Sequence, residues 1–155
     1  MSPGPRPISK VKPWLWGAGA VVAAVVLVAA VAAWTAPVRN SIRVYTDLIV
    51  AANRQDVEAA GRLCTARYLA AHPLRPAPEG GLVGLPRNLH QNFQAWRRGP
   101  RVWLCPTNRV GPVYQFVREP AGWRFDGPVG ILRGRGEFFP LPEGMTEDDA
   151  PADVE

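Results

Sequence analysis

The chain is poor in the residues that most often carry chemistry. Its 155 residues include only two cysteines and two histidines, and these four do not stand at the spacing of metal ligands. The sequence contains no Cys-x-x-Cys pair, no phosphate-binding glycine loop and no Gly-x-Ser-x-Gly elbow. We therefore predict no metal site, no cofactor and no catalytic residue, while an enzymatic role stays an alternative.

Charge is absent from one long stretch, between Lys12 and Arg39. Within it, residues 14–36 are almost wholly apolar and carry tryptophan near both ends, at Trp14, Trp16 and Trp34. As a helix this stretch would span roughly 34 Å, which is enough to cross a hydrocarbon core of about 30 Å, and indole rings favour the membrane interface. The sequence predicts a single transmembrane helix over 14–36, ending at Pro37, after a short basic tail over 1–13.

A cleaved signal peptide is the alternative, with Ala30-Val31-Ala32 as its cleavage site. Because signal peptides have apolar runs of about 7 to 15 residues, the length favours a retained anchor. The small pair Gly19 and Ala23 would permit self-association. Basic residues flank both ends of the run. Those on the N-terminal side lie closer to it, and we expect the N-terminus in the cytoplasm and the following domain outside.

Lysine is rare and arginine abundant, with 18 basic residues against 13 acidic ones. Six of the acids and no base fall in residues 141–155, which predicts a disordered acidic tail. The arginines before it are scattered rather than gathered in one run. We therefore expect no nucleic-acid partner, although a basic body is typical of proteins that bind polyanions.

Residues 38–140 form one predicted domain of about 100 residues. Apolar spacing predicts a helix over 38–53, a second from Asp56 to about His72, and a third that begins at Pro86 and carries Leu89, Phe93 and Trp96. The stretch 72–85 reads as a long irregular loop. From Arg101 the period changes to two, which predicts strands over 101–105, 112–119 and 122–126, with a fourth over 129–132 and a loop from Gly134 to Pro140.

The fold class is thus α+β, with about three helices packed on a curved antiparallel sheet of three to four strands. A tyrosine-bearing first helix, the break Asn53-Arg54-Gln55-Asp56, the run to Leu63-Cys64 and a late hairpin before Trp123 together resemble nuclear transport factor 2-like domains. The resemblance implies an α+β cone with helices packed into a bent sheet. Members of that family include enzymes that use Asp, His and Tyr in the cone.

The candidates for such chemistry are weak. Asp47 lies off the apolar stripe of its helix, and His90 has no visible local partner. Aromatic residues could line an apolar ligand pocket in the cone or simply fill the core. The candidates for such a pocket are Tyr45, Phe93, Trp96, Tyr114 and Trp123.

The two cysteines could pair. Cys64 lies on the inward stripe of the predicted second helix, and Cys105 ends the first strand on the face of Trp103. An oxidising compartment would favour a Cys64–Cys105 disulfide, and the alternative is two buried free thiols. The bridge would also support an extracytoplasmic domain.

Taken together, the sequence favours a single-pass membrane protein whose domain binds another protein or scaffolds an assembly at the membrane surface. A small-ligand or enzymatic domain is the alternative. The partner, the process and the oligomeric state do not follow from the sequence.

Overall fold

The computed structural model describes residues 13–90, 92–107, 110–134 and 136–141, with side chains described from residue 21 onward. The basic tail and, beyond Leu141, the acidic segment that we expected to be disordered lie outside these residues. The chain divides into two compact units, Met1–Thr35 and Ala36–Glu155.

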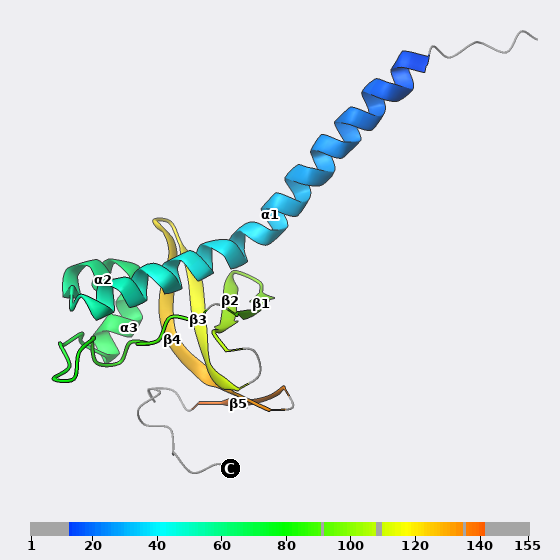
Figure 1. The fold of residues 1–155 in the computed structure, drawn as a ribbon. Coiled ribbons are helices and arrows are strands. Elements are labelled where there is room, and N and C mark those ends of the chain that lie inside the picture. The colour runs from blue at the N-terminus through cyan, green and yellow to red at the C-terminus, as the bar shows by residue number, and fades with distance from the viewer. Residues whose placement is uncertain (1–12, 91, 108–109, 135, 142–155) are drawn as a thin grey trace, which may run out of the picture. The chain divides into compact units, whose positions relative to one another are not determined.

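The first unit is dominated by the N-terminal part of helix α1, which spans Pro13–Asn53 (Figure 1). Every side chain from residue 21 to residue 35 is exposed, including Val25, Leu27 and Val28. By length and composition α1 is able to cross a membrane, although a signal sequence would satisfy the same criteria. Because none of its most apolar window is buried, this part of α1 does not serve as a core helix of the described structure.

Helix α1 continues through Pro37, so the expected helix end at this residue was wrong. Proline lacks the N–H that would bond one turn back, and this usually ends or kinks a helix. Here Pro37 is buried, and the Ser41 hydroxyl, also buried, donates to the Pro37 carbonyl at 3.0 Å. The helix therefore continues without the Pro37 N–H, and the Pro37 carbonyl accepts a hydrogen bond from the buried Ser41 hydroxyl.

The C-terminal part of α1 supplies the first layer of the domain core. Tyr45, Leu48, Ile49 and Ala52 are each at most 1% exposed, which confirms the predicted apolar stripe. The helix ends at Asn53, and Gln55 adopts a left-handed conformation with φ of 55°.

Asp56 then caps α2 (Val57–Leu63) by accepting a hydrogen bond from the Ala59 N–H, as its position predicts. The second helix is shorter than expected. It ends before Cys64, which is extended and forms a bridge with Phe125 of the sheet. Thr65 donates its N–H to the Phe125 carbonyl at 2.8 Å and caps a separate helix, α3 (Ala66–Ala71).

The third predicted helix was wrong. Residues 86–90 are irregular, and the chain then enters strand β1 (Gln94–Arg98). Apolar residues four and three positions apart over so short a stretch also fit a loop followed by a strand. The deciding feature is the Gly99-Pro100 hairpin turn, which pairs Trp96 with Trp103 of β2 (Arg101–Cys105). Leu89, placed on the expected helix stripe, is 56% exposed.

The sheet has five antiparallel strands in the order β1-β2-β3-β4-β5, one more than the upper expectation. Strand β3 (Gly111–Glu119) turns at Pro120-Ala121 into β4 (Gly122–Arg133), which confirms the predicted hairpin. β4 runs on through Gly127-Pro128, where we had expected a gap. β5 (Glu137–Pro140) forms where we had expected a loop.

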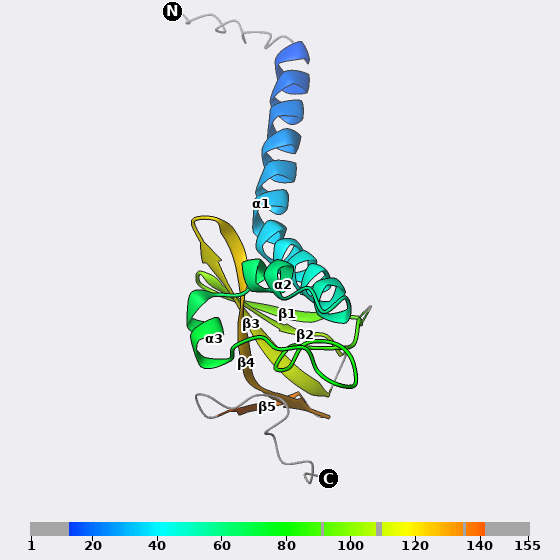
Figure 2. The same cartoon turned by 90° about the vertical axis from the view of Figure 1, so that its left-hand side faces the viewer.

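Within the domain, α2, α3 and the C-terminal part of α1 lie on one side of the sheet, which Figure 2 shows from the helix side. This helix face carries the main core, with Val102, Leu104, Phe116 and Phe125 fully buried. We call the opposite side, away from the helices, the open face. Its side chains stand at positions that face one another across neighbouring strands. They are Trp96, Arg98, Arg101, Trp103, Cys105, Val113, Gln115, Leu132 and Phe138.

The predicted disulfide was wrong, because the two cysteines are free and lie in different clusters. Cys64 belongs to the core of the helix face, whereas Cys105 packs with Val113 and Leu132 on the open face. The sheet therefore stands between the two thiols. The argument for an extracytoplasmic domain that depended on this bridge is lost with it.

Gly127 offers a test of how tightly α3 packs on β4. Its φ is +103°, and an added Cβ would lie 2.8 Å from a ring carbon of Tyr68. We expect Gly127→Ala to destabilise the domain by about 1 to 3 kcal/mol through backbone strain and overpacking. Denaturant unfolding followed by circular dichroism measures the change.

Gly61→Ala in α2 is the matched control, because an added Cβ there meets nothing within 4 Å. It should stabilise the helix by up to about 1 kcal/mol. Equal effects of the two substitutions would contradict the packing described for Gly127.

Candidate binding site on the open face

The sheet curls toward its open face. Trp103 of β2 stacks on Phe138 of β5, with ring centroids 5.0 Å apart and planes at 26°. These strands are three positions apart in the sheet order, or about 14 Å in a flat sheet. Such close stacking requires the outer strands to bend toward one another. Two register shifts in the β3–β4 pair, at Val113/Tyr114 and Gln115/Phe116, supply the local bends.

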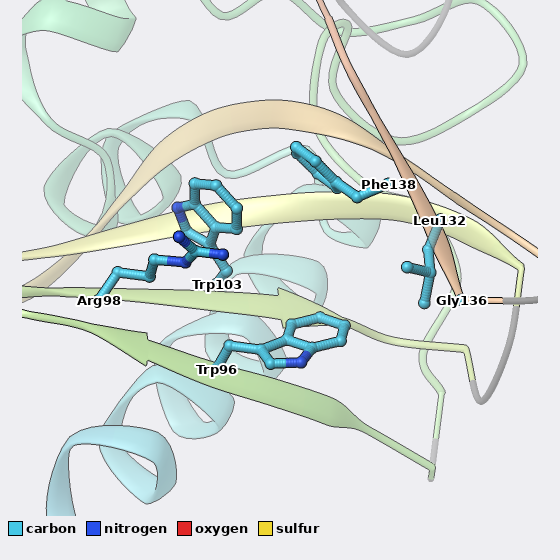
Figure 3. Close-up of a pocket in the computed structure, with 6 residues that line it drawn as sticks. All are labelled: Trp96, Arg98, Trp103, Leu132, Gly136 and Phe138. Carbon is cyan, nitrogen blue, oxygen red and sulfur yellow. The ribbon is translucent and has the colours of Figure 1, made fainter.

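The curl leaves a hollow of about 200 Å³ on the open face (Figure 3). Its walls come from β1, β2, β4 and β5 and from the turn before β5. The lining residues are Trp96, Arg98, Trp103, Leu132, Gly136 and Phe138. In Figure 3 the Arg98 side chain runs alongside the Trp103 ring, and its guanidinium carbon lies 4.7 Å from the ring centroid. The hollow thus combines three aromatic rings with one cation.

A chain of hydrogen bonds through Gln115 and Asp126 fixes the Trp103 ring. The indole Nε1–H donates to Gln115 Oε1 at 3.0 Å, and Gln115 Nε2 donates to Asp126 Oδ2 at 2.8 Å. Asp126 is the unpaired residue of one β4 bulge, since Gln115 pairs with Gly127 and Phe116 with Phe125. The bulge therefore places a carboxylate where it orients the ring that lines the hollow.

Asp126 is itself held from the helix layer. Its carboxylate accepts from the Thr65 hydroxyl at 2.6 Å and from Arg67 Nη2 at 2.7 Å. Burial opposes ionisation of this group, but the hydrogen bonds from Arg67, Thr65 and Gln115, together with the charge of Arg67, outweigh it. They hold the pKa of Asp126 below its ordinary value. The carboxylate is thus ionised at neutral pH and satisfied on each side.

Replacement of Asp126 by asparagine should therefore destabilise the domain at neutral pH. The amide would turn a donor toward the donors of Arg67 and Gln115, and we expect a loss of about 1 to 3 kcal/mol. Because the folded-state pKa of Asp126 is lowered, its contribution is present above the unfolded pKa of about 3.9 and is lost as the pH falls below it. Unfolding free energies between pH 7 and pH 2 should fall less steeply for Asp126→Asn than for the natural chain.

Asp47→Asn is the control for this experiment. Asp47 is exposed, and its ion pair with Arg43, at 3.8 Å, lies on the surface. Loss of its charge should therefore change the free energy of unfolding by less than about 0.5 kcal/mol. A flat pH profile in the natural chain would contradict the role given to Asp126.

The buried thiols are poorly suited to nucleophilic chemistry. Burial raises the pKa of Cys64 to about 12, and the nearby charge of Arg124 only partly offsets this. The thiol is therefore protonated at neutral pH and is a weak nucleophile. Cys105 is 0% exposed, with its sulfur 3.4 Å from the Thr107 hydroxyl.

Thiol titration of protein purified without reductant tests the state of both cysteines. Two thiols should react after denaturation, and both should react slowly in the folded protein because neither is accessible. A count of zero under denaturing, non-reducing conditions would restore the Cys64–Cys105 bridge.

Four of the five aromatic residues proposed for a cone pocket come together on the helix face. Tyr45 contacts Phe93 edge to face at 5.6 Å and Tyr114 at 5.9 Å, while Trp123 packs against the same core. The Tyr45 hydroxyl donates to the Asn88 carbonyl at 2.9 Å. These side chains fill the space between helices and sheet. Trp96, the fifth, lies apart from them and lines the hollow of the open face.

The polar candidates are not brought together. Asp47 is exposed on α1, and His90 is half-buried in the irregular segment before β1. Among residues 13–90, 92–107, 110–134 and 136–141, no group of three or more His, Cys, Asp or Glu side chains could hold a metal ion.

Sequence reasoning missed Arg98, Trp103 and Phe138 as neighbours, and it missed the network around Asp126. One signal was available for Asp126, because the Gly127-Pro128 pair that follows it is typical of an irregular strand. For the hollow no local signal exists, since Trp103 and Phe138 meet only when the sheet curls.

Comparison with known proteins yields no relative. No family model, no curated protein and no solved structure matches the chain.

Proposed function

We propose that this chain is a single-pass membrane protein whose domain binds a partner protein at the membrane surface, through the hollow on its open face. The observation that carries the proposal is the helix α1, in which an unburied apolar run is followed directly by buried core residues. The resemblance to nuclear transport factor 2-like domains is part of this proposal and is supported by the element order, with helices before an antiparallel sheet.

Exposure of the apolar run supports membrane insertion. Valine and leucine side chains from Val21 to Val31 are 55–68% exposed in the isolated chain. A soluble monomer rarely exposes a contiguous apolar patch of more than a few hundred Å². A bilayer would cover this surface, and the helical backbone would satisfy its own hydrogen bonds there.

The short distance along the chain supports a position at the membrane surface. Thr35 is the last residue of the exposed run, and Pro37 is already buried in the domain. Consecutive Cα atoms are about 3.8 Å apart, so the domain would begin within roughly 10 Å of the end of the span. We keep the N-terminus in the cytoplasm as part of the proposal, on the basis of Lys10 and Lys12 close to the run.

The composition of the hollow supports a protein partner over a small-molecule substrate. Tryptophan and arginine are enriched among the residues that dominate binding energy at protein interfaces. At about 200 Å³ the hollow is smaller than the roughly 300 to 1,000 Å³ of typical ligand pockets. It would accommodate one or two side chains of a partner. The main core, by contrast, is occupied by its own aromatic rings.

Membrane attachment is tested by alkaline extraction of membranes from cells that express the chain. The natural chain should stay in the membrane pellet at an intact mass of 16.9 kDa. The double change Val25→Asp and Val28→Asp should release it, because each central aspartate costs about 2.5 to 3.5 kcal/mol in a spanning helix. A product shortened to begin near Ala33 would instead identify the run as a cleaved signal.

The control introduces the same two charges in the domain, as Val57→Asp and Val83→Asp. Both valines are partly exposed, at 39% and 38%, so this variant should remain in the pellet.

In sealed, right-side-out membranes, added protease should digest the domain. Full protection would reverse the proposed orientation.

A further inference from the structure

We propose that the acidic segment 142–155 binds the hollow of its own chain and covers Arg98 and Arg101. In this position the segment would compete with an acidic partner for the same site. The inference rests on the proposed binding role of the hollow and names the chemistry that the hollow accepts, which is a carboxylate-rich peptide.

The charges around the hollow favour an acidic occupant. No acidic residue that the structure describes lines the hollow, and the acids on the neighbouring strands β3 and β4 are paired elsewhere: Asp126 with Arg67 at 2.7 Å, and Glu119 with Arg124 at 4.0 Å. Arg98 and Arg101, which face each other across β1 and β2, have no acidic partner among the residues that the structure describes. The hollow therefore presents aromatic rings and the cation of Arg98, with Arg101 next to it across β1 and β2, and no described carboxylate lines it.

The composition of the segment matches these charges. Residues 142–155 contain six carboxylates and no basic residue, whereas the chain before them carries all 18 basic residues. Arginine recognises carboxylates with paired hydrogen bonds. Each exposed pair contributes little to binding and is weakened by salt. Several such pairs would give an occupant that binds weakly enough for a partner to displace.

The segment also starts close to the hollow along the chain. The segment begins directly after Leu141, whose N–H donates to the Val129 carbonyl at 3.0 Å. Phe138, three residues before Leu141, lines the hollow. An extended segment of this length reaches roughly 45 Å, so Arg98 and Arg101 lie within its range. A short tether also gives an effective concentration on the order of millimolar, which allows weak contacts to be populated.

Site-specific photo-crosslinking tests the inference on the full chain in detergent micelles. A benzophenone amino acid replaces Thr146, and the linked peptides are mapped by mass spectrometry in a mixture of isotopically light and heavy chains. We expect light–light and heavy–heavy links to residues 94–103 or 136–140. The yield should fall several-fold in the double variant Arg98→Gln and Arg101→Gln, and also in 0.5 M salt.

The control variant removes two other exposed arginines, as Arg54→Gln and Arg75→Gln, and should leave the yield unchanged. Circular dichroism of each variant checks that the domain stays folded. Links that map elsewhere, or that persist in the Arg98/Arg101 variant, would overturn the proposal. Mixed light–heavy links would make a second copy the occupant and would also overturn it.

Two further measurements separate this inference from the proposed function. A labelled peptide of sequence 142–155 is added to a chain whose six acids in that segment are changed to amides. Binding of the peptide, together with failed crosslinks, would retain the acidic specificity of the hollow but reject the chain's own segment as occupant. A different outcome would be that crosslinks avoid the hollow and that the Arg98/Arg101 variant loses binding to nanodiscs with anionic lipid. Lipid head groups, and not the segment, would then be the occupant of the site.

Discussion

The carboxylate of Asp126 joins the two halves of the domain. It accepts hydrogen bonds from Thr65 and Arg67 on the helix side and from Gln115 on the open face. Because Asp126 is only 8% exposed, loss of a buried donor such as Thr65 or Gln115 would leave part of a buried charge unsatisfied in a low-dielectric region. The position of Trp103, and with it one wall of the hollow, depends on this carboxylate through Gln115.

The two faces of the sheet have different roles in this picture. On the helix face, aromatic rings and aliphatic side chains from α1, α2 and α3 pack into a filled core. On the open face a smaller cluster contains only strand residues, and the curl of the sheet exposes aromatic rings beside arginine. The larger buried core therefore lies on the helix face, whereas the hollow lies on the open face. Aromatic side chains fill the space between helices and sheet, so the hollow is separate from that core.

Several elements were predictable because their signals are local. The Asp56 cap, the stripe of Tyr45, Leu48 and Ile49 and the Pro120-Ala121 turn each depend on a few neighbouring residues. The third helix failed because the stripe Leu89, Phe93 and Trp96 is too short to distinguish a helix from a loop and a strand. The Gly99-Pro100 turn settled the matter by pairing Trp96 with Trp103. Helix α1 continues through Pro37 although proline is a local breaker, and Pro37 is buried in the domain at this point.

By itself the sequence determined the long apolar helix, the α+β class, the order of the main strands and the opposite charge of body and acidic segment. These properties follow from composition and short periodicities, which do not require knowledge of distant neighbours. Only the tertiary structure decided that Cys64 and Cys105 lie on opposite faces, that Asp126 is buried among donors, and that Trp103 meets Phe138. The first depends on which face of the sheet each residue takes, the second on a bulge in β4, and the third on the curl of the sheet; no local sequence pattern encodes any of them.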